Sequence, residues 1–248
     1  MTTKLKIFMF PLLAFCAIGS SSCFFDFDDD DDIFGCEHGS GSTVSRDLQL
    51  DDFHSVTLEI SGDVYVRQGN DFSVTAEGQE NILDLLDTDV HNGVWEIDFT
   101  DCVSNFRNLK IFITMPEVRA LTATASGDIR SENVLEADDL VLLATGSGNI
   151  ILDLDANNVE ATSTGSGDIR LDGFCDNLNV VLTGSGDFEG FSLKAGNADV
   201  RTTGSGDAEV NVEDNLTVRI TGSGDVSYKG NPSISSTITG SGRLINAN

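Results

Sequence analysis

Residues 164–187 read TGSGDIRLDGFCDNLNVVLTGSGD, one complete unit of a repeat that begins and ends on Thr-Gly-Ser-Gly-Asp. The Gly-Ser-Gly core of this unit occurs at 146–148, 165–167, 184–186, 204–206, 222–224 and 240–242, with spacings of 19, 19, 20, 18 and 18 residues. Ala125-Ser126-Gly127 is a degenerate earlier copy. A fixed period near 19 residues is typical of a solenoid, in which each unit buries its apolar face against its neighbours.

The residues between the glycine motifs alternate between apolar and polar. Leu178, Val180 and Leu182 precede one motif, and Ile169 and Leu171 follow another. A period of two indicates strands, because successive side chains of a strand point to opposite faces. The sequence therefore predicts an all-β fold, a right-handed parallel β-helix of about 19 residues per coil.

The same parity carries through the motif, with both glycines on the inward side and the residues between them pointing outward. Stacked coils should then align three outward columns. The threonine column is Thr145, Thr164, Thr183, Thr203, Thr221 and Thr239, and the serine column is Ser147, Ser166, Ser185, Ser205, Ser223 and Ser241. The acidic column is Asn149, Asp168, Asp187, Asp207 and Asp225, and Arg243 ends it.

The first half of the chain is less regular, and we interpret residues 44–120 as a β cap and residues 121–248 as the repeat β-helix. Ser61-Gly62-Asp63 is an isolated relative of the motif. Residues 81–87 (NILDLLD) are expected to form a short helix, and residues 94–99 and 109–114 to form strands. A cap is expected because the open end of a β-helix exposes unpaired backbone.

The sequence predicts an export signal at residues 1–22. Lys4 and Lys6 precede a 13-residue apolar run at residues 7–19, which is too short to span a bilayer. Ser20-Ser21-Ser22-Cys23 resembles the lipobox of bacterial lipoproteins, although Ser20 occupies a position where a branched aliphatic residue is usual. The resemblance implies cleavage before Cys23 and a membrane partner through a lipid on that cysteine.

Residues 23–43 are interpreted as the lipidated cysteine and an acidic tether. The run FFDFDDDDD at residues 24–32 should stay extended, since its like charges repel one another. It also resembles surface-export signals of some didermal bacteria, so both sides of an outer membrane stay open as locations. Three further cysteines remain; a disulfide between Cys36 and Cys102 is one arrangement, and Cys175 is a candidate small buried residue.

The net charge of −27, from 14 basic and 41 acidic residues, excludes nucleic-acid binding on electrostatic grounds. The three histidines are scattered and no Cys-x-x-Cys occurs, which gives a zinc site little basis.

Residues 53–69 (FHSVTLEISGDVYVRQG), the 81–86 segment and the TGSGDI coils together resemble the head GIN domain of putative auto-transporter adhesins. The similarity covers roughly residues 44–246. It implies a β-helical cell-envelope protein and carries over no catalytic residue.

Three function classes follow. The first is a non-enzymatic envelope lipoprotein that binds a glycan or a surface protein through the threonine and serine columns. The second is a structural protein stabilised by calcium at Asp168, Asp187, Asp207 and Asp225, the one cofactor considered. The third is an enzyme acting on polysaccharides; Arg130, Arg170, Arg201 and Arg219 could serve it, but they are more simply partners of neighbouring acids.

Overall fold

The structure is a computed structural model that describes residues 35–248. Residues 36–248 form one compact unit that contains the whole described core, and this unit therefore has what it needs to fold by itself. The predicted signal peptide, Cys23 and the acidic run 24–32 lie outside the described residues. No helix in the described part of the chain is long and apolar enough to cross a membrane.

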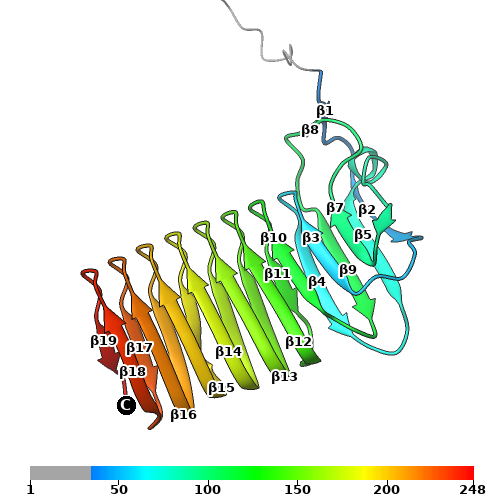
Figure 1. The fold of residues 1–248 in the computed structure, drawn as a ribbon. Coiled ribbons are helices and arrows are strands. Elements are labelled where there is room, and N and C mark those ends of the chain that lie inside the picture. Colours follow the sequence, from blue (N-terminus) through cyan, green and yellow to red (C-terminus); the bar gives the residue numbers. More distant parts are fainter. Residues whose placement is uncertain (1–34) are drawn as a thin grey trace, which may run out of the picture. The chain divides into compact units, whose positions relative to one another are not determined.

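The repeats form a solenoid of stacked parallel coils, about 19 residues each, as predicted (Figure 1). Each coil has two straight faces, one before the Gly-Ser-Gly turn (the pre-turn face) and one after it (the post-turn face). Along the stack, the pre-turn face is formed by β7 (Val94–Ile97), β3 (Ser55–Leu58), β10 (Ala120–Ala123), β12 (Leu135–Ala144), the later parts of β13 (Ile150–Ser163), β14 (Ile169–Leu182), β15 (Phe188–Thr202) and β16 (Ala208–Ile220), and β18 (Ser233–Ile238).

The post-turn face runs through the same coils. It is formed by β9 (Lys110–Met115), β4 (Asp63–Gln68), β11 (Ile129–Ser131), the first parts of β13 to β16, β17 (Val226–Lys229) and β19 (Leu244–Asn246). Both faces bury every second residue, so that columns of Leu, Ile and Val fill the interior.

The boundary of the cap differs from the predicted 44–120, because β3, β4, β7 and β9 are already parallel layers of the stack. The isolated Ser61-Gly62-Asp63 is the turn of one such layer. This layer, residues 55–68, lies between residues 94–115 and 120–131, which places the coils out of chain order. Sequence periodicity carries no information on that exchange.

The cap itself is smaller and antiparallel. On the post-turn face, β5 (Ser73–Gln79) pairs with β9, and β2 (Thr43–Leu48) covers β5. On the pre-turn face, β6 (Val90–His91) pairs with β7. The short helix expected at 81–87 is α1 (Glu80–Leu83), which buries Ile82 and Leu83.

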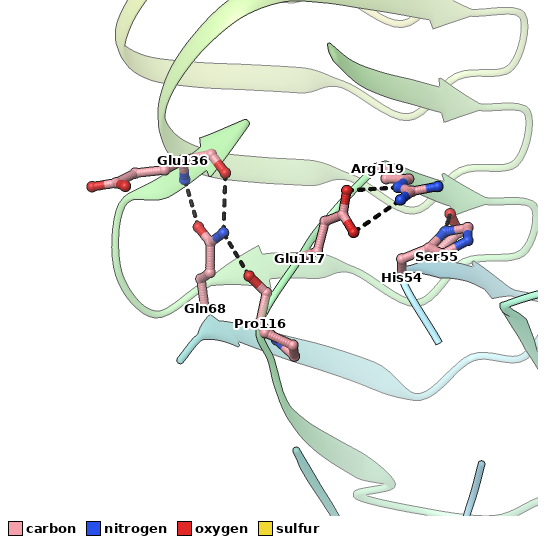
Figure 2. Close-up of polar contacts among 7 residues, drawn as sticks. All are labelled: His54, Ser55, Gln68, Pro116, Glu117, Arg119 and Glu136. Atoms are coloured by element: carbon pink, nitrogen blue, oxygen red, sulfur yellow. Dashed lines mark hydrogen bonds and ion pairs between the residues drawn. The ribbon is translucent and has the colours of Figure 1, made fainter. Parts of the chain in front are cut away.

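Gln68 joins the out-of-order layer to the chain that crosses it (Figure 2). Its Nε2 donates to the carbonyl oxygens of Pro116 and Glu136, both at 3.0 Å, and its Oε1 accepts from the Glu136 N–H at 2.6 Å. Beside this crossing, Arg119 donates two hydrogen bonds to Glu117, and the bonded guanidinium lowers the pKa of that carboxyl. The Gln68 amide thus connects three segments, at residues 68, 116 and 136, whose proximity the repeat period does not predict.

A disulfide between Cys36 and Cys102 holds the start of the described chain, with a Cα–Cα distance of 4.7 Å. Next to it, β1 (Glu37–His38) pairs in parallel with β8 (Val103–Ser104). Residues 36–38, which the sequence analysis placed in the tether of residues 23–43, are therefore fixed to the body of the protein. Cys175 is free and buried, and its burial raises the pKa of the thiol to about 12.

We expect replacement of both Cys36 and Cys102 by serine to lower the free energy of unfolding by about 2–4 kcal/mol, because the bridge closes a loop of 66 residues. Denaturant unfolding of residues 35–248 measures this change. In the unaltered protein a thiol reagent should find no reactive group before denaturation and one afterwards, that of Cys175. A reactive thiol in the native state, or equal stability of the variant, would contradict the bridge.

Candidate binding surfaces

The Gly-Ser-Gly turns pack directly on one another along the stack. A Cβ atom at Gly167 would overlap the carbonyl oxygen of Gly148, and one at Gly165 would overlap that of Gly146. None of the turn glycines in the repeats has a positive φ. Glycine is therefore required by the close approach of the preceding coil along the stack.

Outward from these glycines, the predicted threonine and serine columns exist. Backbone hydrogen bonds between successive turns keep them in line, for example Ser166 N–H to Gly146 O and Ser185 N–H to Gly165 O, both at 2.9 Å. The members are exposed: Thr145, Thr164, Thr183, Thr203, Thr221, Ser147, Ser166, Ser185, Ser205 and Ser223. Together they form a row of exposed hydroxyl groups, here called the hydroxyl ridge. Its part in ligand binding stays a prediction.

The acidic column is a hydrogen-bonded ladder. Each carboxylate accepts a hydrogen bond from the backbone N–H of its counterpart in the next coil, at 2.7–2.9 Å for the pairs that begin at Asp168, Asp187, Asp207 and Asp225. In the earlier coils, Asp63, Asp128 and Asn149 supply the accepting oxygen. The side chain therefore does what a backbone carbonyl does elsewhere in the sheet.

Arg243 ends the ladder at the position where another aspartate would stand. Its backbone N–H donates to Asp225 at 2.8 Å, and its guanidinium lies 2.6 Å from the second oxygen of the same carboxylate. This pairing lowers the pKa of the Asp225 carboxyl. The last carboxylate of a column of like charges is thus neutralised within the chain.

The ladder leaves a calcium ion few ligands at these aspartates. One oxygen of each carboxylate already accepts a backbone N–H. This N–H lies beside the carboxylate, where a calcium ion would need further oxygen ligands. Within residues 35–248, no group of three or more His, Cys, Asp or Glu side chains is arranged to hold a metal. The hydrogen bonds account for the stacking of like charges without a cation.

A second ladder, which the sequence analysis missed, lies at the opposite corner of the coils. The amide of Asn158 donates to Asp139, Asn177 to Asn158, Asn197 to Asn177, and Asn215 to Asn197, at 2.8–3.2 Å. The signal was present, because these asparagines recur at intervals of 19, 20 and 18 residues, like the glycine motif.

The asparagine ladder forms one wall of a groove of about 640 Å³ on the pre-turn face. The groove crosses five coils, roughly 19 Å at the usual strand spacing. Its other wall is the outward column of the same strands. The lining residues of this asparagine groove are Asp139, Asn158, Asn177, Asn197 and Asn215 on one wall, Val141, Glu160, Asn179, Asp199 and Thr217 on the other, and the apolar Leu140, Val159, Leu178 and Ala198 between them.

The outward arginines are partners of acids, as expected. Arg201 and Arg219 both contact Asp199, at 3.2 and 3.1 Å. Arg130 pairs with Asp128 at 2.6 Å, and Arg170 contacts an acid of its own strand at 3.6 Å.

Glu209 is the one described carboxyl whose pKa is clearly raised. Partial burial disfavours its charge, and Glu189 stands beside it in the neighbouring coil. Because the folded state then holds the proton more tightly than the unfolded state, ionisation of Glu209 costs stability as the pH rises through its folded pKa.

We predict that Asp187→Ala lowers the melting temperature by about 2–6 °C, since the N–H of Asp207 loses its acceptor. Asp187→Asn should restore most of the loss, because the amide oxygen accepts as that of Asn149 does. Addition of calcium or of a chelator should leave the melting temperatures of all three proteins unchanged. If calcium raised the melting temperature of the unaltered protein but not that of Asp187→Ala, a calcium site at this column would be supported.

For Glu209→Gln, we predict a melting temperature higher by about 1–3 °C at neutral pH and no gain at pH values below the ordinary carboxyl pKa. Asp225→Asn provides the control of opposite sign. Its carboxyl pKa is lowered, so its stabilisation is present at neutral pH and is lost as the pH falls through the folded pKa. Thermal melts across this pH range measure both, and a gain for Glu209→Gln that persists in acid would refute the assigned cause.

Comparisons with known proteins agree with this architecture. A family model described as "Putative auto-transporter adhesin, head GIN domain" matches residues 52–232. The crystal structure of a putative adhesin from Bacteroides fragilis is 26% identical, with a TM-score of 0.81 over 85% of this chain and 99% of that chain. No curated protein matches the chain.

Two further solved structures share the fold. A putative adhesin from Parabacteroides merdae is 20% identical, with a TM-score of 0.71, and a putative lipid binding protein from Parabacteroides distasonis is 23% identical, with a TM-score of 0.66. Each match covers 86% of this chain and 99% of the other. The stacked Gly-Ser-Gly-Asp coils and the match over residues 52–232 show that the chain belongs to the head GIN domain family of putative auto-transporter adhesins.

Proposed function

We propose that this protein is a non-enzymatic binding module of the bacterial cell envelope that holds a neutral glycan chain in the asparagine groove. The observation that carries the proposal is the groove itself, a concave surface with side-chain amides in four of its five coils. The adhesin label of the family supports a binding role at the envelope.

The chemistry of the groove suits sugar hydroxyls. An amide offers both donors and acceptors, so each coil can exchange hydrogen bonds with one unit of a repeating ligand. Glu160 adds an acceptor on the facing wall, and Val141, 43% exposed, adds an apolar contact. The protein's net charge of −27 opposes polyanionic ligands.

Binding is favoured over catalysis by the way the acids of the groove are used. Asp199 is held by two arginines, and Asp139 accepts the first hydrogen bond of the asparagine ladder. General acid–base cleavage of a glycosidic bond needs two free carboxyl groups facing one another across the substrate. In the groove Glu160 could take one of these roles, but the other two carboxyl groups, Asp139 and Asp199, are already engaged.

We further propose that a lipid on Cys23 anchors the module to the outer membrane and that the acidic segment after it acts as a tether. The signal-like residues 1–22 and the position of Cys23 at their end support this placement.

Glu160→Ala combined with Asn179→Ala should weaken binding to immobilised neutral polysaccharides about 10- to 100-fold, the value of two hydrogen bonds. Retention on a panel of such polysaccharides measures the affinity, and an unchanged melting temperature verifies the fold. The matched control is Ser166→Ala with Ser185→Ala, on the hydroxyl ridge of the same two coils.

Loss of binding in the control pair alone would move the site to the hydroxyl ridge. Absence of retention of the unaltered protein on every polysaccharide would refute glycan binding.

Cys23→Ser should abolish incorporation of a labelled fatty acid and release the protein from the membrane fraction. Protease shaving of intact cells, with a periplasmic protein as control, then reports the side of the membrane. Unchanged labelling of Cys23→Ser would contradict the anchor.

A further inference from the structure

The two ends of the solenoid are finished differently. At the first end, antiparallel strands β5, β2 and β6 cover the outermost parallel layer. At the last end, β18 pairs with β16 along one edge and β19 pairs with β17 along one edge, and in the described part of the chain no further strand is in register beyond them (Figure 1).

The last coil keeps apolar residues at core positions although no strand of residues 35–248 covers them. Ile234 is in register with Leu216, and Ile238 with Ile220. Leu216 and Ile220 are 1% and 0% exposed, whereas Ile234 and Ile238 are 42% and 43% exposed. All six residues of β18 are exposed. One more layer of strands would bury both isoleucines.

This edge also lacks the charges that normally prevent edge strands from pairing. Between Gly230 and Asn248, Arg243 is the only charged side chain in a protein of net charge −27. The outward positions that carry Asp199 and Arg201 in an inner coil carry Ser235 and Thr237 here. A strand from an equally acidic protein can therefore approach the last coil without charge repulsion at the contact.

The pattern of β18 is complementary to itself. Ile234, Ser236 and Ile238 share the inward side. In an antiparallel pair centred on Ser236, Ile234 of one chain lies opposite Ile238 of the second copy, and inward residues stay inward. A two-fold axis at this point also sets β19 against β19, so that both open edges pair at once.

From this we propose that the last coil is a dimer interface, in which β18 and β19 pair with the same strands of a second copy and bury Ile234 and Ile238. Since the other end is capped, the association closes at two copies. A second copy is favoured over an unrelated strand because it supplies the matching Ile-x-Ser-x-Ile pattern on both sides of one axis.

The test is the oligomeric state of residues 35–248, measured by sedimentation over a range of concentrations. We expect a reversible dimer. Ile238→Lys should be monomeric, because it sets lysines across the contact. Val141→Lys is the matched control, since Val141 is also 43% exposed but lies on an inner coil, and it should remain dimeric.

Cysteine crosslinking tests the register. Ser236→Cys should form an intermolecular disulfide, since residue 236 faces its own counterpart across an antiparallel pair, within disulfide reach. Ser235→Cys, one residue away, should not, and the native Cys175 is buried. A monomer at all concentrations, larger open assemblies, or equal crosslinking of the two variants would overturn the proposal.

Discussion

The close contact between successive Gly-Ser-Gly turns constrains everything else in this molecule. Each turn rests on the carbonyl oxygens of the turn before it, with no room for a Cβ atom at either glycine. Once the turns are held in this contact, the strands on both faces follow in parallel register, and the alternation of side chains puts the same kind of residue at the same place in every coil. The columns of threonine, serine, aspartate and asparagine are consequences of that register.

Register explains how so acidic a protein can stack like charges at strand spacing. Carboxylates about 5 Å apart repel one another, and the repulsion must be offset locally. Here each aspartate of the ladder accepts an N–H that the turn leaves without a carbonyl partner, so one interaction satisfies a backbone donor and stabilises a charge. Asn149 performs the same task without charge, which shows that the accepting oxygen, more than the ionised group, is what the turn requires.

The periodic part of the fold could be predicted from the sequence because it repeats. The spacing of Gly-Ser-Gly predicts the length of the coil and the acidic column, and the alternation before and after it predicts the two faces. The asparagine ladder was equally periodic, but its residues are ordinary at surface corners, so the spacing drew no attention to Asn158 or Asn177. The insertion of residues 55–68 between 94–115 and 120–131 depends on long-range contacts such as those of Gln68, which no local pattern encodes. The pairing of Cys36 with Cys102 depends on the same cap geometry.

The aspartate ladder and the strands have different requirements at the end of the stack, and this makes the two ends of the solenoid different. The aspartate ladder is directional, since each carboxylate accepts the backbone N–H of the coil that follows. Arg243 supplies this N–H to Asp225, as an aspartate would, and in addition pairs its guanidinium with the same carboxylate. The sheet needs a different ending, a strand that covers the backbone and the core together, and within residues 35–248 only the capped end has one. At the last coil the electrostatic ending is complete while the strand edges and the core positions of Ile234 and Ile238 stay open. A neutral, open edge on an acidic solenoid favours association at this place, because a second copy meets little like charge there.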